Sequence, residues 1–376
     1  MSRRGGGGRW LLLAVVSALA PGVALAQTGG GTTLARTGVY FESYSFGNGL
    51  AFKRISELTI PVSVTQGFGN RVVLDVATAY ASASSDQPGG GRIEHSGFID
   101  TDVRATVNVK PGRLLLSFVG TLPTGATTVS NTTIPLFGAA ATDLFAFMTP
   151  NFGTGGGFSS GFASACPISA NWALGAAASY RHGASYVPVT GGSALIPGGE
   201  VRTRIGIEGP FGAGKYFRGA VLYTTTAAND IGAGEQSSIG DRVLAYLSTS
   251  MPLGSSHLSL YGWDMRRLRA SNEADSTTIA VPSGNVLALG ARLEKPLGSN
   301  AVIVPLLEFR HELTGDTGKM ELLGFLLRTG ADLRYRLSDR ATGVIQAQIA
   351  VGTLQDQGTR ASLVGPRIGA LIEWSR

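Results

Sequence analysis

Side chains alternate between two kinds along the whole of Leu323–Leu337. One set is apolar or small, and the other carries Arg328, Asp332, Arg334 and Arg336. A period of two predicts a β-strand with one apolar and one charged face, because successive side chains of a strand point to opposite sides. The run exceeds the roughly 3–10 residues of most strands. Its length suits a tilted strand that crosses a bilayer with its charged face toward a wet interior.

The same alternation recurs in other parts of the chain, including residues 102–109, 201–208, 287–294 and 307–312 and the last strand around 367–374. In each case the charged residues lie on one face. A soluble sheet protein turns its apolar face inward, whereas a barrel in a membrane turns its apolar face outward to lipid. We therefore expect the charged positions to line the lumen of a transmembrane barrel. The expected lumen-lining residues are Asp102, Arg104, Arg202, Arg204, Arg292, Glu308, Arg310, Arg328, Asp332, Arg334, Arg336 and Arg367.

Short turns rich in Gly, Pro and Asn separate these segments and alternate with longer stretches such as Gly125–Ala141, Val187–Gly199 and Gln355–Arg360. This arrangement is typical of outer-membrane barrels, whose periplasmic turns are short. The turns predict an all-β, antiparallel, up-and-down barrel of about 14–16 strands, with 16 if Val39–Phe46 and Glu57–Thr65 form its first hairpin. The tight turns are Gly67–Asn70, Lys110–Gly112, Pro167–Asn171, Pro210–Lys215, Pro252–Ser256, Pro296–Asn300 and Ser338–Arg340.

Aromatic residues gather near the ends of the predicted strands, as expected for belts at the two membrane interfaces. The residues next to tight turns are Trp172, Tyr216, Phe217, Tyr335 and Trp374, and those toward the loop ends are Tyr80, Tyr180, Tyr223 and Trp263.

The N-terminus has the features of a secretory signal peptide. Three arginines precede the apolar run Trp10–Leu19, and a small-residue site at Ala24–Ala26 stands before Gln27. Such a segment is removed on export, so we expect cleavage between Ala26 and Gln27. The alternative, a membrane anchor, is disfavoured because Pro21 and Gly22 end the run short of the roughly 20 residues that a spanning helix needs. The expected organisation is a signal peptide over 1–26, a flexible leader over 27–37 and one barrel over 38–376.

Charge and cysteine content exclude other classes of protein. The chain has 31 basic and 25 acidic residues, and loss of the three signal arginines leaves 28 against 25. This near balance, without any basic run, argues against nucleic-acid binding. Cys166 is the single cysteine, so no internal disulfide stabilises the exported chain. We expect barrel closure to do so instead, because in lipid every backbone group must be paired within the protein.

The residue types that support catalysis are present but scattered. His95, His182, His257 and His311 lack metal-ligand spacing. Asp100 and Asp102 would share one face of a strand, and Ser185 follows His182, but such pairs arise by chance in a strand-rich chain. We therefore predict no metal, no cofactor and no enzymatic activity.

Several short motifs resemble the outer-membrane family named for the MetA pathway of phenol degradation. They are Thr37–Tyr40, Phe68–Val72, Leu122–Gly125, Phe152–Gly155 and the stretch from Trp172 to Tyr180. The chain departs from the family pattern in the long insertion Ala126–Ala141 and in the two residues after Trp374. The resemblance implies an outer-membrane barrel that passes small hydrophobic or aromatic molecules.

Two functions remain open on this basis. The first is a channel in the outer membrane, without a plug domain in its leader, that passes small apolar or aromatic solutes by diffusion. Its apolar lumen patch would include Leu222, Tyr246 and Leu326. The second is a structural or interaction barrel with a closed lumen and partner-binding loops. Expected partners are the lipid bilayer, the solute and the barrel-assembly machinery, which would bind the C-terminal strand ending near Trp374.

The alternation predicts opposite effects for two neighbouring substitutions. Leu327→Arg would place a cation in lipid and should cost about 2–4 kcal/mol of stability. Arg328→Leu should be milder because it faces the lumen. Heat-modifiable mobility on gels would compare the two variants. Loss of the folded band only in Arg328→Leu would show that the register is wrong by one residue.

Overall fold

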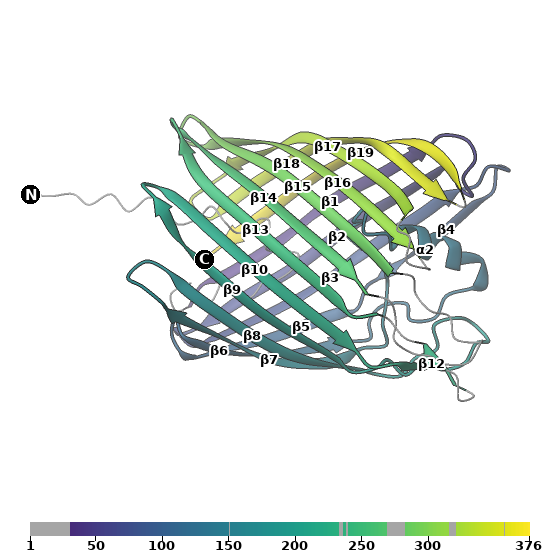
Figure 1. The fold of residues 1–376 in the computed structure, drawn as a ribbon, viewed down its shortest axis with the longest axis horizontal. Helices are drawn as coiled ribbons and strands as arrows, with labels where there is room; N and C mark the ends of the chain where they lie inside the picture. The colour runs from purple at the N-terminus through teal and green to yellow at the C-terminus, as the bar shows by residue number, and fades with distance from the viewer. Residues whose placement is uncertain are drawn as a thin grey trace, which may run out of the picture.

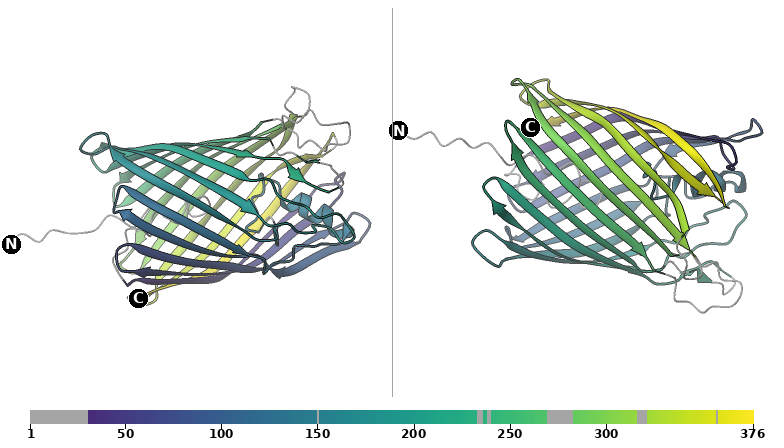
Figure 2. Two further views of the ribbon diagram at one scale, coloured as in Figure 1. Left: turned by 90° about the horizontal axis from the view of Figure 1, so that it is seen from below. Right: turned by 45° about the horizontal axis from the view of Figure 1, so that its top comes forward.

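The alternating segments form long antiparallel strands that follow one another around a closed barrel, as Figures 1 and 2 show. The computed structural model describes residues 31–149, 151–232, 236–237, 240–268, 283–315, 321–356 and 358–376. The predicted signal peptide and its cleavage site at Ala26 and Gln27 lie outside the described residues.

The first half of the described chain contains nine strands and two short helices. They are β1 (Thr33–Phe46), β2 (Arg54–Phe68), β3 (Val72–Asp86), β4 (Arg92–Phe98), β5 (Thr101–Lys110), β6 (Leu114–Leu122), the 3₁₀ helix η2 (Asn131–Thr133), α2 (Ile134–Ala140), β7 (Gly157–Pro167), β8 (Ala173–Gly183) and β9 (Glu200–Gly212).

The second half consists of strands. They are β10 (Lys215–Thr226), β11 (Asn229–Asp230), β12 (Gln236–Ser237), β13 (Arg242–Leu253), β14 (Ser256–Arg267), β15 (Ser283–Leu297), β16 (Ala301–Gly315), β17 (Glu321–Arg336), β18 (Ala341–Asp356) and β19 (Thr359–Ser375).

Every wall strand pairs with its neighbours in the chain, and β1 closes the ring by pairing with β19. Strands β4 and β5 both pair with β3 and so form one interrupted strand, which makes the barrel 16-stranded. The small hairpin of β11 and β12 stands apart from the wall. The predicted antiparallel barrel is confirmed at the upper end of its strand range. β1 begins at Thr33, so Thr33–Thr37, expected in the leader, belong to the wall.

The seven predicted tight turns all join neighbouring strands at one end of the barrel. Glycines with positive φ occur in them, for example Gly254 at 59° and Gly298 at 77°, because the turn backbone must enter the left-handed region. Longer connections lie at the other end. One of these expectations was wrong: β18 and β19 extend to Asp356 and Thr359, so Gln355–Arg360 is a short hairpin turn rather than a long loop.

The outer face of the wall is apolar. Leu307, Leu327, Ile345 and Ile368 are exposed large hydrophobic side chains at outward register positions, while Arg328 faces inward. An apolar surface that surrounds a closed barrel matches a lipid environment and would be unfavourable in water. The fold is thus a transmembrane β-barrel of the outer-membrane type.

Most of the predicted interface aromatics do lie on the outer face. Trp172 packs against Phe217 at a ring separation of 6.1 Å, and Tyr335 and Trp374 are exposed. Two assignments were wrong. Trp263 faces the lumen, where the guanidinium of Arg310 lies 5.7 Å from its ring centre. Tyr216 also faces inward, on the same side of β10 as Arg218.

The connection between β6 and β7, residues 123–149 and 151–156 of the described chain, carries η2 and α2 and packs part of its length against the inward face of the wall. We call it the internal loop. Its buried apolar side chains, among them Leu136, Leu144 and Phe145, form a core cluster with Tyr44 and Leu326 of the wall. No helix in the described part of the chain is long and apolar enough to cross a membrane.

Three inward tyrosines lie over glycines of a neighbouring strand. Tyr261 covers Gly290, and a Cβ added at Gly290 would overlap the tyrosine ring. Tyr44 and Tyr40 cover Gly365 and Gly369 in the same way. The Tyr261 hydroxyl donates a hydrogen bond of 2.7 Å to Glu308 Oε2, so glycine at position 290 lets the ring support an inward carboxylate.

We therefore expect Gly290→Ala to cost about 1–3 kcal/mol, the usual penalty for overpacking a well-filled site. Urea unfolding in detergent micelles would measure it. Gly120→Ala is the matched control, because a Cβ there meets no atom within 4 Å. Equal stability of the two variants would contradict the packing role of Gly290.

Candidate functional site

The internal loop is held at its two ends by Asp100. Asp100 Oδ1 accepts a hydrogen bond from the Gly125 backbone nitrogen at 3.1 Å, and Oδ2 accepts from the backbone nitrogen and hydroxyl of Thr154 at 2.6 and 3.0 Å. The prediction that Asp100 and Asp102 share a strand face was wrong, because Asp100 lies in the break between β4 and β5. The break leaves Asp100 free to bind both ends of the loop.

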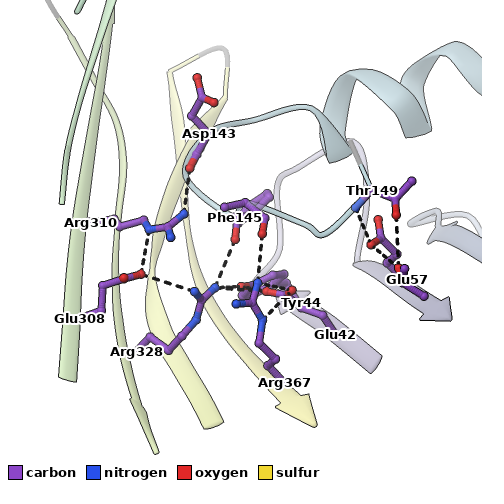
Figure 3. Close-up of polar contacts among 12 residues, drawn as sticks. Glu42, Tyr44, Glu57, Asp143, Phe145, Thr149, Glu308, Arg310, Arg328 and Arg367 are labelled. Atoms are coloured by element: carbon purple, nitrogen blue, oxygen red, sulfur yellow. Dashed lines mark hydrogen bonds and ion pairs between the residues drawn. The ribbon is translucent and has the colours of Figure 1, made fainter. Parts of the chain in front are cut away.

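The centre of the loop is bound by Arg328 of β17 (Figure 3). Its Nη2 donates to Glu42 Oε1 at 3.1 Å, to the Tyr44 hydroxyl at 2.7 Å and to the carbonyl oxygen of Phe145 at 3.2 Å. Its Nη1 donates to Glu308 Oε1 at 3.5 Å. The side chain is nearly inaccessible, with 3% of the residue exposed. One arginine therefore connects two wall carboxylates to the backbone of the internal loop.

Two further arginines bind the same loop segment through its carbonyl oxygens. Arg310 Nη1 donates to the Asp143 oxygen at 3.2 Å, and Arg367 Nη2 donates to the Ala146 oxygen at 3.0 Å. Arg310 also pairs with Glu308 at 2.9 Å, and Arg367 Nε donates to Glu42 Oε2 at 2.8 Å. Arg310, Arg328 and Arg367, with Glu42 and Glu308, form what we call the loop latch.

A second carboxylate completes the attachment on the β2 side. Glu57 Oε1 accepts a hydrogen bond from the Thr149 backbone nitrogen at 2.9 Å and from the Thr59 hydroxyl at 2.7 Å. Stacking adds to these polar contacts, since the rings of Phe145 and Tyr44 lie 4.8 Å apart. The loop segment is thus fixed by both charge and apolar packing.

The charges of the loop latch are buried in pairs, and Arg328 Nε is the buried atom of the latch left without a hydrogen-bond partner among the described residues. Burial of an ion is costly unless it is paired and its remaining hydrogen-bonding groups find partners. Glu42 is shared by Arg328 and Arg367, and Glu308 by Arg310 and Arg328. Beside this network, burial raises the pKa of the Asp143 carboxyl, and nearby Arg267, Arg242 and Arg310 oppose that shift.

The predicted lumen-lining residues divide into two groups. Glu308, Arg310, Arg328 and Arg367 are brought together in the loop latch and are largely covered. The rest are spread over the inward face of the wall at the register positions expected for them. These are Asp102 and Arg104 on β5, Arg202 and Arg204 on β9, Arg292 on β15, and Asp332, Arg334 and Arg336 on β17.

Several of the spread residues have partners of their own. Asp102 Oδ1 accepts a hydrogen bond from the Thr121 hydroxyl at 2.7 Å. Asp332 Oδ1 accepts from the side-chain amides of Gln346 and Gln348 at 3.0 and 3.3 Å. Arg334 pairs with Glu294 at 3.3 Å. The contacts of Asp102 and Asp332 connect neighbouring strands, and the pair of Arg334 with Glu294 spans β16 from β17 to β15. These contacts do not converge on one site.

The sequence reasoning missed Glu42, Tyr44 and Glu57, which contribute the wall side of the attachment. Their signal was present: Glu42 and Tyr44 alternate with apolar Phe41 within the predicted first strand. The long insertion Ala126–Ala141 was noted, but nothing in its own sequence showed that it enters the barrel.

The residues considered for catalysis do not assemble. His95, His182, His257 and His311 lie on β4, β8, β14 and β16. Within the described ranges no group of three or more His, Cys, Asp or Glu side chains is placed to hold a metal ion. His95 instead packs against the ring of Phe152 at 4.6 Å.

These features define a transmembrane β-barrel with a charged interior and a loop fastened inside it. No family model matches the chain, and no curated protein matches it, so the resemblance to the MetA-pathway family stays a prediction.

Among solved structures, the chain is similar to outer-membrane proteins of low sequence identity. The CymD monoaromatic hydrocarbon channel has a TM-score of 0.44 at 10% identity, covering 99% of this chain and 95% of CymD. OccAB3 of Acinetobacter baumannii has a TM-score of 0.47 at 9% identity, covering 92% and 99%. OmpT of Vibrio cholerae has a TM-score of 0.43 at 10% identity, covering 93% and 99%.

The loop latch changes the expected effect of Arg328→Leu. The sequence predicts a mild change, but the structure shows a buried arginine whose removal leaves Glu42 and Glu308 short of a partner. Loss of one member of a buried ion pair costs about 3–5 kcal/mol, so Arg328→Leu should be strongly destabilising. Urea titration followed by gel mobility would measure this.

Arg336→Leu is the control, since Arg336 is an exposed, inward arginine of the same strand. A loss of stability no larger in Arg328→Leu than in Arg336→Leu would argue against the latch.

Proposed function

We propose that this protein is an outer-membrane channel through which small solutes of apolar or aromatic character diffuse passively, and that the internal loop narrows its passage. The size of the barrel supports this proposal. About 8 strands enclose an interior that side chains fill, whereas about 16–18 leave an aqueous channel. This wall has 16 strands and so belongs to the larger class, and it holds the internal loop against one side of its interior.

The observation that carries the proposal is the contrast between the two sides of the lumen. Near β1 and β17 the inward side chains are buried beneath the loop. Across the barrel, the inward Arg202 side chain is 50% exposed and that of Glu208 41% exposed. A lumen filled by side chains would bury these groups. Their exposure indicates water-accessible space on the β9 side.

The apolar character of the solute is supported by the loop rather than by the residues expected from the sequence. Leu326 lies under the loop and Tyr246 is also buried, which leaves Leu222 half-buried. The loop instead exposes Ile134 and Met148, which are 44% and 46% accessible. Leu136 and Ala140 occupy the covered side of α2, so Ile134 lies on its free side.

The alternative is a structural barrel that serves partners through its long loops. The loop latch favours this view, because its three arginines pair with two glutamates and hold the loop over one side of the lumen. The structural-barrel alternative does not account for the exposed inward side chains on β9. We propose no catalytic role for the chain.

Reconstitution into planar lipid bilayers tests the proposal. The intact protein should give stable ohmic conductance. Replacement of residues 129–148 by a short Gly-Ser linker, which keeps Asp100 and the two loop ends it binds, should give a larger single-channel conductance because the passage widens. A silent bilayer with both proteins, each shown to be folded by gel mobility, would overturn the channel function.

A further inference from the structure

A strip of arginines lines the inner wall of the barrel on strands β8, β9, β10 and β13. Residues that are directly paired on neighbouring strands point to the same face of the sheet. Arg181 is paired with Glu200. Thr224 is paired with Arg202 on one side and Arg242 on the other, so the register places these arginines together on the inward face. We call this set the arginine strip. Its members are Arg181, Arg202, Arg204, Arg218 and Arg242.

The arginine strip faces the internal loop across the lumen. The loop is bound to β1, β16, β17 and β19 by the latch, and α2 contacts β2 and β3. In the cyclic order of strands, β10 lies farthest from β1, followed by its neighbours β9 and β13. The strip and the part of the loop bound by the latch therefore lie on opposite sides of the lumen, and Asp143 of the loop approaches the strip at Arg242.

The acidic residues near the strip are too few to neutralise it. Glu200 pairs with Arg202 at 2.5 Å and with Arg242 at 3.6 Å. Glu208 pairs with Arg218 at 2.7 Å. A further carboxylate, Asp143 of the loop, lies near enough to Arg242 to interact with its charge.

Two members of the strip have no ion pair among the described residues, namely Arg181 and Arg204. Inward positions on β7 and the adjoining part of β8 carry small residues such as Ser159, Gly161 and Ala177. Arg181 is exposed, and Arg204 is half-buried. The wall therefore presents a net positive surface that is accessible from the lumen.

We propose that the passage selects small organic anions, with a carboxylate guided along the arginine strip and an apolar body against the exposed Ile134 and Met148 of the loop. This inference rests on the proposed channel function and narrows its substrate class. Guanidinium groups match carboxylates with two parallel hydrogen bonds. A passage lined by one sign of charge also raises the local concentration of the opposite ion. The apolar part of such a solute would contact Ile134 and Met148 of the loop, a contact that an inorganic anion could not make.

Swelling of proteoliposomes tests the selection with benzoate and benzamide, which share size and ring but differ in charge. The intact protein should pass benzoate faster than benzamide. Double replacement Arg202→Gln with Arg204→Gln should slow benzoate about fivefold, the factor for one unit-charge attraction at contact in water, because Arg202 is already paired with Glu200 and Arg204 has no ion pair among the described residues. Benzamide swelling should stay unchanged, which also shows that the variant is folded and open.

Arg360→Gln is the control because it removes an arginine charge from the outer face instead of the lumen. Its guanidinium lies 6.0 Å from the ring centre of the outward Phe325. We expect wild-type benzoate swelling from this variant. Inorganic phosphate, tested alongside, should pass more slowly than benzoate.

The outcomes separate the two proposals. Equal rates for benzoate and benzamide, unchanged in the double variant, would overturn anion selection and leave the channel function standing. Phosphate passing as fast as benzoate would overturn the role of the apolar wall. Absence of swelling with every solute would overturn the channel function itself.

Discussion

Pairing between the first and last strands is the constraint on which the rest of the structure depends. The Thr33 nitrogen donates to the Arg376 oxygen at 3.0 Å, and the Arg376 nitrogen donates to the Thr33 oxygen at 2.9 Å. In lipid an unpaired strand edge has no water to bind, so a sheet is stable there only when it closes. Closure also encloses a lumen. Every inward side chain must then find its partners among other inward groups, the internal loop or water.

The internal loop gives this barrel a second kind of core. Its apolar residues pack against Tyr44 and Leu326 as in a soluble domain, inside a wall whose outer face is stabilised by lipid. Hydrophobic burial alone would let the loop settle in many orientations, because such contacts are not directional. The charged hydrogen bonds of Arg328 and Asp100 fix its position. Packing holds the loop in the lumen, and the directional bonds determine where it lies.

The strands could be predicted from the sequence because their information is local. Alternation in Leu323–Leu337 already separates the lipid side from the lumen side, and the glycine turns give the order of strands. The environment of Arg328 could not be predicted in this way. Its partner Glu42 is 286 residues away and the carbonyl of Phe145 is 183 away. The local pattern predicts that the Arg328 side chain points inward. Whether this side chain contacts water or protein depends on barrel closure and on the position of the internal loop.

The way in which the internal loop is attached affects which of its residues can be substituted. Arg310, Arg328 and Arg367 grip the peptide carbonyls of Asp143, Phe145 and Ala146 rather than their side chains. A carbonyl oxygen is present whichever amino acid occupies the position. Substitutions on the free side of this loop segment therefore leave the hydrogen bonds from the three arginines in place. The position of the loop can therefore stay the same while the side chains that it presents to the interior change.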